Sequence, residues 1–450
     1  MRIEPTIFKA YDIRGKYPAE INEFVAQRLG EALTAFFSKK NHKKKLKILV
    51  CRDVRNSSQP LKEALINGII SCGSDVWDAG TGTTPFFYFL MHTLKFDGGI
   101  MITASHNPPE YNGFKIRGRG GIPIFSGNGL EVIRNLVKRK PLLFDSMGMV
   151  TTAADYREKY IHFLAKNASI KRIKTVVDAG GGSTTFFLPE LLNKFPKITY
   201  KPLFFEPDGA FKKHSPSPYL PASQKPIKEE LKKGGYSFGA IFDGDGDRVI
   251  FFDEKGEMVR SEYILGIFVS EELKDKETNT FVLPVNTSRS VREYLKERGG
   301  KVVLSRVGNT FMHMAMRRAR ASLGAEMSGH FYFQKFFYAD SGLFAWLKLA
   351  AILSKNPRPL SQLIKPFKRY IFSGEINFNI KDGRTVIKKV ERKYQGEKIS
   401  RLDGITVEFP DWWFNIRPSN TEPIVRLVLE AKTKELFDEK LIQVEKLIKG

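Results

Sequence analysis

The sequence predicts an α/β protein with three α/β domains, each built on a mixed sheet, and a smaller C-terminal α+β domain. Short apolar segments alternate with amphipathic segments over most of the chain, which is typical of α/β layers. After Pro357 and Pro359 the pattern changes to closely spaced strand-like segments. A chain of 450 residues has room for three or four domains. We expect the domains to cover residues 1–150, 151–254, 255–365 and 366–450.

In the first two domains, apolar runs of four to six residues predict strands, and longer segments with helical periodicity predict helices. A glycine-rich turn connects the first strand and helix of the second domain. The expected strands are 48–51, 75–78, 99–103, 174–178 and 238–242. The expected helices are 23–37, 60–71 and 184–193.

The third domain continues the alternation, whereas the fourth is rich in strand-like segments. In the third domain we expect a helix from about residue 261, strands at 281–283 and 302–304, and helices at 288–297 and 310–320. In the fourth we expect antiparallel strands at 369–378, 406–409, 412–416 and 424–430, followed by a helix from Lys434.

The chain is strongly basic, which favours anionic ligands. Its 73 Lys and Arg exceed its 49 Asp and Glu by 24. Residues 39–47 hold six lysines, so a nucleic-acid-binding protein is one alternative. However, this run lacks the interleaved aromatic residues that stack on bases, and it lies between a predicted helix and a predicted strand. We therefore expect a solvated loop and no nucleic-acid partner.

Neither a membrane span nor a secreted scaffold is expected. The most apolar segment, residues 343–354, is shorter than a spanning helix and contains Lys348. The N-terminus lacks the continuous apolar region of a secretory signal. Cys51 and Cys72 are too few for a disulfide framework or a thiolate zinc site. These features predict a cytoplasmic protein.

Residues 103–115, TASHNPPEYNGFK, follow the apolar strand residues 99–102. Ser105 therefore falls just past the carboxyl end of a strand, where α/β sheets place their ligands. The two prolines stiffen the loop, and Asn112-Gly113 predicts a turn. No G-x-S-x-G motif surrounds Ser105, which argues against a hydrolase of that type. The segment predicts a serine nucleophile, with His106 beside it, on a rigid loop.

An acidic loop, DGDGDR, follows the expected strand 238–242. Asp243, Asp245 and Asp247 would repel one another unless a cation neutralised them, and hard oxygen ligands suit Mg²⁺. A calcium EF-hand is excluded because the position that requires glycine holds Arg248. Arg248 beside a cation site indicates that a phosphate is bound there.

Two further loops carry polar side chains suited to a phosphorylated sugar. In GAEMSGH, the carboxylate of Glu326 could accept hydrogen bonds from vicinal hydroxyls, with Ser328 and His330 nearby. In RPSNTEP, Arg417 offers a bidentate fork, and the small side chains and amides after it can wrap a phosphate. The small side chains are those of Ser419, Asn420 and Thr421.

Together these loops resemble the α-D-phosphohexomutase superfamily, specifically its bacterial phosphomannomutase/phosphoglucomutase branch. The resemblance covers nearly the whole chain and includes the segments YDIRG, RDVR and PDG. It implies four domains around a central cleft, each contributing one loop. Asn309 stands where some members carry a histidine that touches the substrate.

The resemblance implies roles for the motif residues. The phosphoserine corresponds to Ser105, which with Asp243, Asp245 and Asp247 would bind Mg²⁺. The sugar-reading loop corresponds to Glu326, Ser328 and His330, and the phosphate-binding loop to Arg417, Ser419, Asn420 and Thr421. The basic residues of the reaction centre correspond to Arg14, His106, Lys115 and Arg248.

The expected activity is the interconversion of hexose 1-phosphate and hexose 6-phosphate through a phosphoserine and a hexose 1,6-bisphosphate, which would also serve as activator. His106, Lys115 and His330 are candidate proton acceptors, with Lys115 preferred. A phosphoglucosamine mutase and a phosphosugar-binding protein without turnover remain alternatives. The expected partner is a phosphosugar, and the expected state is a monomer or homodimer.

Overall fold

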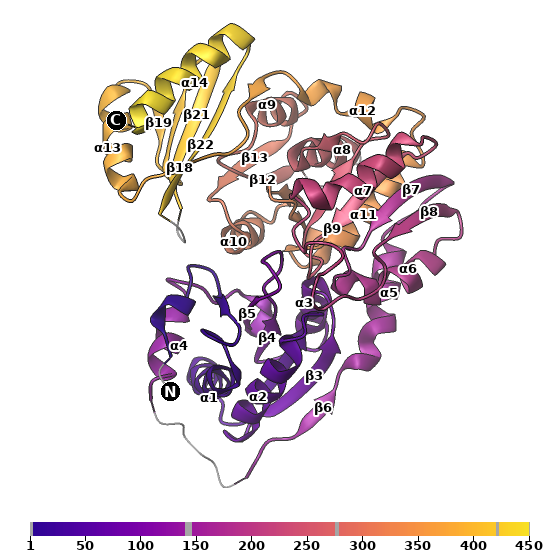
Figure 1. Ribbon diagram of the computed structural model, residues 1–450, viewed down its shortest axis with the longest axis vertical. Helices are drawn as coiled ribbons and strands as arrows, with labels where there is room; N and C mark the ends of the chain where they lie inside the picture. Colours follow the sequence, from indigo (N-terminus) through magenta and orange to yellow (C-terminus); the bar gives the residue numbers. More distant parts are fainter. Residues whose placement is uncertain (1–2, 140–145, 275–278, 420–422, 450) are drawn as a thin grey trace. The chain divides into compact units, whose positions relative to one another are not determined.

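The computed structural model describes residues 3–139, 146–274, 279–419 and 423–449. The chain forms two compact units, one of Met1–Val259 and Ala339–Leu360, the other of Arg260–Tyr338 and Ser361–Gly450. Three sheets contain both parallel and antiparallel strand pairs, and the fourth, near the C-terminus, is antiparallel (Figure 1). The predicted fold class is therefore confirmed. Within the described ranges, no helix combines the length and apolarity needed to cross a membrane.

The first sheet of the first unit has the strand order β1-β5-β4-β2-β3-β6. Its central strands are parallel, whereas β5 runs antiparallel to both β4 and β1. The strands are β1 (Ile13–Lys16), β2 (Lys47–Arg52), β3 (Asp75–Thr81), β4 (Gly98–Ile102), β5 (Tyr111–Gly118) and β6 (Val150–Thr152). The helices are α1 (Glu23–Asn41), α2 (Ser58–Ile70), α3 (Thr84–Thr93) and α4 (Leu130–Leu136), with 3₁₀ turns Pro5–Ile7, Arg119–Gly121 and Ala154–Tyr156.

Helices α1 and α2 pack against each other at unusually close range. A Cβ on Gly30 would lie 2.4 Å from the carbonyl oxygen of Leu65, and one on Gly68 would lie 2.1 Å from that of Gln27. Only glycine fits at these two positions, so the backbones can approach and bury the apolar faces of both helices against the sheet. This packing fixes the layer beneath the strands that carry the serine loop.

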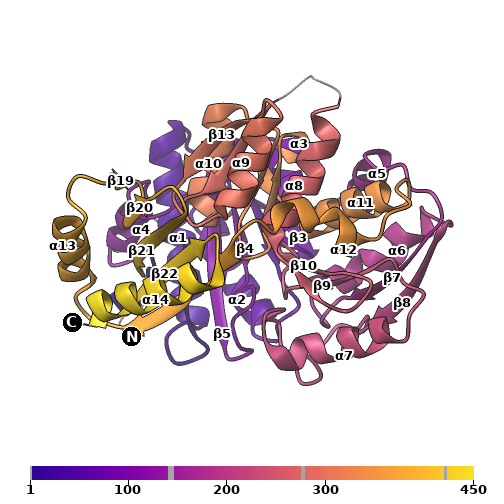
Figure 2. The same cartoon turned by 90° about the horizontal axis from the view of Figure 1, so that it is seen from above.

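The second sheet of the first unit has the order β11-β10-β9-β7-β8. Figure 2 shows α7 on one side of these strands, with α5 and α11 on the other. The strands are β7 (Ile173–Asp178), β8 (Ile198–Leu203), β9 (Phe238–Phe242), β10 (Val249–Phe252) and β11 (Met258–Val259). The helices are α5 (Arg157–Lys166), α6 (Leu188–Asn193), α7 (Pro221–Lys232) and α11 (Gly342–Leu353), with a 3₁₀ turn at Ser183–Phe186; the short strand β16 (Ala339–Asp340) precedes α11.

In the second unit, three strands of the third sheet are parallel in the order β13-β12-β14, and β15 pairs antiparallel with β14. Their carboxyl ends therefore meet at one edge of the sheet. The strands are β12 (Thr280–Pro284), β13 (Lys301–Ser305), β14 (Leu323–Ala325) and β15 (Phe331–Phe333). The helices are α8 (Ser261–Glu272), α9 (Arg289–Glu297) and α10 (Asn309–Ala319), with a 3₁₀ turn at Gln334–Phe336.

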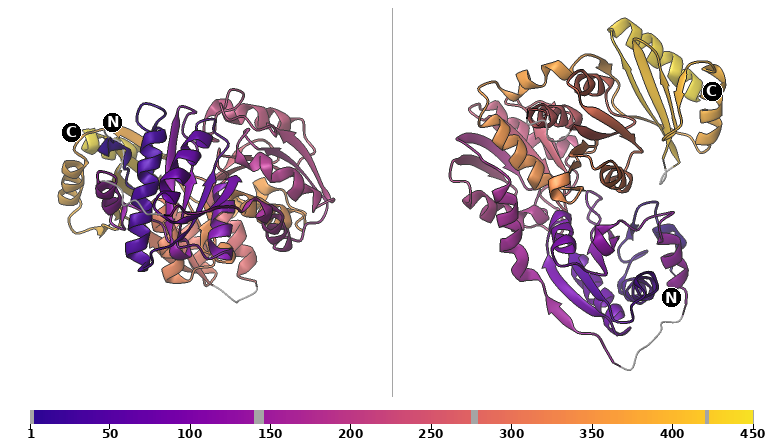
Figure 3. Two further views of the ribbon diagram at one scale, coloured as in Figure 1. Left: turned by 90° about the horizontal axis from the view of Figure 1, so that it is seen from below. Right: turned by 180° about the vertical axis from the view of Figure 1, so that it is seen from behind.

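The C-terminal sheet is an antiparallel meander with the order β17-β22-β21-β20-β19, and β18 also pairs with β22. Helices α13 and α14 both contact this sheet and each other, and can be followed from two sides in Figure 3. The strands are β17 (Ile371–Phe372), β18 (Ile376–Asn379), β19 (Lys398–Ser400), β20 (Ile405–Glu408), β21 (Trp412–Pro418) and β22 (Ile424–Ala431). The helices are α12 (Leu360–Leu363), α13 (Gly383–Lys393) and α14 (Lys434–Lys449), with a 3₁₀ turn at Lys365–Phe367.

Most expected elements are present within a few residues of their predicted ends, but two predictions were wrong. Asn112 and Gly113 lie inside strand β5 and not in a turn. The strand expected at 369–378 is two strands, β17 and β18, because Gly374 adopts φ 71° and turns the chain between them.

Candidate functional site

Ser105 lies in the loop after β4, as predicted, but its side chain is buried, with 2% of the residue exposed. Its Oγ donates a hydrogen bond of 2.9 Å to Oδ2 of Asp243. Nδ1 of His106 lies 3.3 Å from the same Oγ. Its φ of 53° places Ser105 in the left-handed region, which non-glycine residues seldom adopt outside special sites. The serine is thus presented in a constrained conformation towards a carboxylate.

The acidic loop connects β9 and β10, which form an antiparallel hairpin. Oδ1 of Asp243 accepts backbone hydrogen bonds from Gly246 at 3.0 Å and Arg248 at 3.2 Å, so the loop folds around this carboxylate. Gly246 has φ 72°, a conformation open to glycine. As a result, each of the three aspartates offers one oxygen within 4.8 Å of the others, and all three side chains are buried.

Lys115, on β5, donates hydrogen bonds to two of these three carboxylates. Its Nζ donates to Oδ2 of Asp245 at 2.7 Å and to Oδ2 of Asp247 at 2.5 Å. Burial lowers the pKa of Lys115, but the two carboxylates outweigh that effect and hold this pKa well above its ordinary value. Burial, with the charges of Asp247 and Asp245, raises the pKa of Asp243 well above its ordinary value.

The donor set fits a hard divalent cation. Three of the four predicted ligands, Asp243, Asp245 and Asp247, are carboxylates, and the fourth is Ser105. Among the described residues, Oδ1 of Asp245 is buried without a hydrogen-bond partner. A buried carboxylate oxygen without a donor is costly unless a cation or water occupies its free lone pairs. Asp243, Asp245 and Asp247 therefore have the composition and burial of a Mg²⁺ site.

The remaining basic residues predicted for the reaction centre also lie beside these loops. Nη1 of Arg14, on β1, donates to Oδ1 of Asn107 at 2.7 Å and to the carbonyl oxygen of Ala104 at 3.4 Å, while its Nη2 pairs with Asp12. Nε of Arg248 lies 3.6 Å from Oδ2 of Asp243. The structure thus brings Arg14 to the serine loop and Arg248 to the acidic loop.

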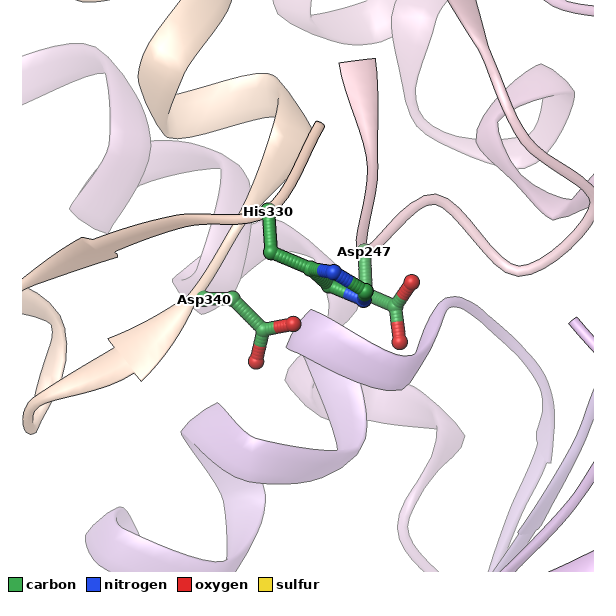
Figure 4. Close-up of side chains that lie close together, drawn as sticks. All are labelled: Asp247, His330 and Asp340. Atoms are coloured by element: carbon green, nitrogen blue, oxygen red, sulfur yellow. The ribbon is translucent and has the colours of Figure 1, made fainter. Parts of the chain in front are cut away.

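A fourth carboxylate in the same unit lies beside the acidic loop. Asp340, from β16, has an oxygen within 4.8 Å of one from Asp247, and both side chains are buried (Figure 4). Sequence reasoning did not select Asp340, because no spacing rule relates it to a loop some ninety positions earlier in the sequence.

In the second unit, the Glu326 loop is the turn between β14 and β15. Oε1 of Glu326 accepts a hydrogen bond of 2.7 Å from the backbone N–H of Gly308, and Oε2 accepts one of 2.5 Å from the hydroxyl of Tyr332. Nδ1 of His330 lies 2.9 Å from Oγ of Ser328 and 3.6 Å from Oε2 of Glu326. The three predicted sugar-binding side chains therefore form one cluster, in which the carboxylate is held by two donors.

Arg417 lies at the end of β21 and is buried. Its Nη2 pairs with Oε2 of Glu375 at 3.1 Å, and its Nε lies 3.7 Å from Oδ2 of Asp403. The backbone N–H of Ser419 donates to the carbonyl oxygen of Ile424 and closes the hairpin. Of the predicted phosphate-binding loop, Asn420 and Thr421 lie outside the described residues.

Several residues that sequence reasoning missed hold the predicted ones in place. The hydroxyl of Thr84 donates to Oδ2 of Asp245 at 2.5 Å, and Tyr332 orients Glu326. Oδ2 of Asp403 accepts from the backbone N–H of Val307 at 2.9 Å, in addition to its contact with Arg417. A carboxylate or hydroxyl with no motif around it carries no sequence signal, so only the fold reveals these contacts.

Four domain-family models match the chain in order. They are "Phosphoglucomutase/phosphomannomutase, alpha/beta/alpha domain I" at residues 5–141, domain II at 158–256, domain III at 260–370, and the C-terminal domain at 375–444.

Curated proteins and solved structures match over the full length. A phosphomannomutase of Vibrio cholerae is 35% identical over 460 aligned residues, covering 99% of this chain and 99% of that protein. A phosphomannomutase of Methanocaldococcus jannaschii is 36% identical over 449 residues, with 98% and 97% coverage. The crystal structure of a phosphoglucomutase/phosphomannomutase family protein from Burkholderia thailandensis superimposes with a TM-score of 0.91 at 28% identity, covering 100% of this chain and 98% of that one.

Proposed function

Because the chain belongs to the phosphoglucomutase/phosphomannomutase family, we propose that it interconverts hexose 1-phosphates and hexose 6-phosphates through a phosphoserine and a hexose 1,6-bisphosphate. The observation that carries this proposal is the contact between Oγ of Ser105 and Oδ2 of Asp243. A phosphoryl carrier beside a trio of buried carboxylates suits phosphoryl transfer, whereas binding without turnover would require neither. The proposed substrate is a phosphosugar, and the proposed cofactor is Mg²⁺.

In the proposed reaction, the bond between phosphorus and Oγ of Ser105 breaks while a bond from phosphorus to a sugar hydroxyl oxygen forms. A divalent cation bound by Asp243, Asp245 and Asp247 would neutralise charge on the phosphoryl oxygens. Arg14 and Arg248 add positive charge to the same loops and so favour the extra negative charge of the transferred group.

The hydroxyl that attacks phosphorus must lose its proton, and Lys115 remains our proposed acceptor. Burial alone would favour its neutral amine, and Asp245 and Asp247 hold it as an ammonium. If those carboxylates shared their charge with a bound cation, the neutral amine of Lys115 would be favoured, and it could accept the proton. His106, whose Nδ1 is 3.3 Å from Oγ of Ser105, and His330 are the other candidates.

To return its other phosphate to Ser105, the bisphosphate intermediate must turn around. Arg417 and Ser419 are proposed to bind the distal phosphate of either orientation, with Asn420 and Thr421 completing the loop. Glu326, Ser328 and His330 are proposed to bind ring hydroxyls. Released hexose 1,6-bisphosphate would rephosphorylate a serine that had lost its phosphate, which is the basis for expecting it as activator.

The deciding experiment is a set of coupled assays of the purified protein with mannose 1-phosphate, glucose 1-phosphate and glucosamine 1-phosphate. We expect turnover of the first two. Turnover of glucosamine 1-phosphate alone would replace the proposal with a phosphoglucosamine mutase, and binding without any turnover would replace it with a phosphosugar-binding protein. The domain boundaries at residues 150, 254 and 365, and a monomeric or homodimeric state, stay predictions.

A further inference from the structure

Arg55 is an arginine in the interior of the first unit, three positions after the end of β2, with 1% of its surface exposed. Nε of its guanidinium donates to Oδ2 of Asp53 at 3.1 Å. Both terminal nitrogens donate to backbone carbonyl oxygens of the serine loop: Ser105 at 2.9 Å, Asn107 at 2.6 Å, Pro108 at 2.7 Å and Tyr111 at 3.1 Å. One side chain therefore donates hydrogen bonds to four carbonyl groups between Ser105 and Tyr111.

The loop needs such a partner because its carbonyl oxygens point inward. Carbonyl oxygens buried without donors are costly, and Pro108 and Pro109 supply no N–H of their own. A guanidinium presents five donors in a fixed planar fork, so it can satisfy several acceptors that surround it. The charge of the fork is compensated locally by Asp53, which is also buried.

The contact to Ser105 matters most, because the backbone of that residue is strained. Its φ of 53° lies in a region that persists in a non-glycine residue only where the surroundings hold it. Its N–H donates to Oγ1 of Thr103 at 2.8 Å, and its carbonyl oxygen accepts from Arg55. The peptide groups on both sides of Ser105 are thus fixed, and this conformation directs Oγ to Asp243.

Arg55 also contacts the segment that covers the acidic loop. Its guanidinium lies 5.2 Å from the centre of the Phe211 ring. A Cβ on Gly244, within the acidic loop, would lie 3.2 Å from Cζ of Phe211 and 2.6 Å from the carbonyl oxygen of Ser105. The same guanidinium therefore borders the serine loop and a residue packed on the acidic loop.

We propose that Arg55 is a positioning residue for phosphoryl transfer, which holds Ser105 in its strained conformation and in register with the carboxylates of the acidic loop. This role rests on the proposed function and adds a residue that touches neither the sugar nor the phosphate. Because misplacement of a reacting atom by about 1 Å can cost about 100-fold in rate, loss of the fork lowers kcat. KM for the hexose phosphate changes little, since Arg55 is not among the residues proposed to bind it.

The test compares Arg55→Lys and Arg55→Ala with wild type and with Lys62→Ala. Lys62 makes a partly buried ion pair of 2.6 Å with Asp78 in the same domain, so its loss destabilises the domain without touching the serine loop. For each protein, kcat and KM with glucose 1-phosphate and the Tm are measured. The Arg55→Ala protein is then assayed with millimolar guanidinium chloride and with the same concentration of sodium chloride.

We expect both Arg55 variants to lose about 100-fold in kcat with KM changed less than about threefold, and Lys62→Ala to keep its kcat despite a lower Tm. A lysine keeps the charge but lacks the planar fork, so Arg55→Lys should not recover the rate. Free guanidinium should restore part of the kcat of Arg55→Ala, whereas sodium chloride should not.

The proposal is overturned if Arg55→Lys keeps a kcat within tenfold of wild type, or if guanidinium and sodium chloride affect Arg55→Ala equally. Should Arg55→Ala fail to fold, the kcat and KM of Arg55→Lys decide the question alone. A wild-type protein without mutase activity would instead overturn the proposed function, so the two failures are distinguishable.

Discussion

Oγ of Ser105 donates a 2.9 Å hydrogen bond to Oδ2 of Asp243 across 138 positions of sequence. The serine follows β4 of the first sheet, and the aspartate follows β9 of the second. The carboxyl ends of β4 and β9, which belong to separate sheets, therefore bring Oγ of Ser105 and Oδ2 of Asp243 into contact. The chemistry of each residue depends on this convergence, because a serine alone or an acidic loop alone would be an ordinary polar surface feature.

Replacing Ser105 with alanine should abolish hexose phosphate turnover while the protein stays folded. The hydroxyl is the proposed phosphoryl carrier, and its removal deletes one atom from a buried site. Kinetic assays and thermal melts would check both points, and intact mass after incubation with glucose 1,6-bisphosphate would show whether the protein is still phosphorylated. Ser126→Ala, at an exposed serine that donates to Glu131, is the matched control. A Ser105→Ala protein with near wild-type rate would refute the phosphoserine assignment.

Removing divalent cations should abolish activity, and added Mg²⁺ should restore it. The buried carboxylates of the acidic loop repel one another, and one oxygen of Asp245 has no hydrogen-bond partner among the described residues, so a cation is needed there. Activity is measured after exhaustive EDTA treatment and again after Mg²⁺ is added back. Full activity in EDTA would show that Asp243, Asp245 and Asp247 do not form an obligatory metal site.

Mannose 1-phosphate and glucose 1-phosphate should be used with efficiencies within about tenfold, or about 1.4 kcal/mol. The oxygens of Glu326, oriented by Gly308 and Tyr332, retain lone pairs that can accept hydrogen bonds from the vicinal hydroxyls on carbons 3 and 4. Mannose and glucose differ only at carbon 2, for which we propose no binding residue. Galactose 1-phosphate, epimeric at carbon 4, should be a poor substrate. Equal rates with galactose 1-phosphate and mannose 1-phosphate would show that Glu326 does not bind the ring hydroxyls. Strict exclusion of glucose 1-phosphate would show that the protein contacts the hydroxyl on carbon 2.

Arg417→Ala should weaken phosphosugar binding by about 1.5 to 3 kcal/mol, the usual value of a hydrogen bond to a charged group. It should also slow turnover, because the bisphosphate intermediate would be lost more often before it turns around. Binding is measured by calorimetry with a non-reacting Ser105→Ala background. Arg401→Ala is the control, since Arg401 pairs with Glu391 on the surface of the same domain. Equal affinities of the two variants would exclude Arg417 from the phosphate site.

Asp178→Asn should stabilise the protein increasingly as the pH rises from about 4 to about 8. Burial raises the pKa of Asp178 from 3.8 to about 8, and burial also lowers the pKa of the neighbouring His214. Between about pH 4 and about pH 8 the folded state keeps the proton of Asp178 that the unfolded state has released, so the contribution of Asp178 to the free energy of unfolding falls as the pH rises. The Asn variant lacks this loss. Thermal melts of both proteins at several pH values would test it, and a constant Tm difference would contradict it.

The local motifs could be predicted from the sequence because the residues that act together in each motif are close in the chain. Asp243, Asp245 and Asp247 converge through the glycines between them, and the Glu326 cluster closes within a single hairpin. In contrast, the partners that orient these side chains come from distant elements. Thr84 lies 161 positions from Asp245, and Gly308 lies 18 positions from Glu326.

Two errors at the level of elements also have physical causes. Helix α3 was missed because nearly all of its side chains are buried, so its sequence lacks the amphipathic periodicity that predicts a helix. Asn112-Gly113 favours a turn in isolation, but Gly113 faces Arg14 in the ladder between β1 and β5, where a Cβ would lie 2.4 Å from the carbonyl oxygen of Ile13. The glycine serves a close strand contact there, so tertiary structure overrides the local preference.

The contacts of Asp403 limit which residue the C-terminal domain can carry at this position. One of its carboxylate oxygens accepts the Val307 N–H of the preceding domain and also faces the Arg417 guanidinium. The next amide along, that of Gly308, donates to Glu326. A chimera that takes its last domain from another enzyme would replace the partner of the Val307 amide, and would need an acidic residue at the position of Asp403 to keep this hydrogen bond. Recombination between relatives would therefore have to preserve this one contact between the last two domains.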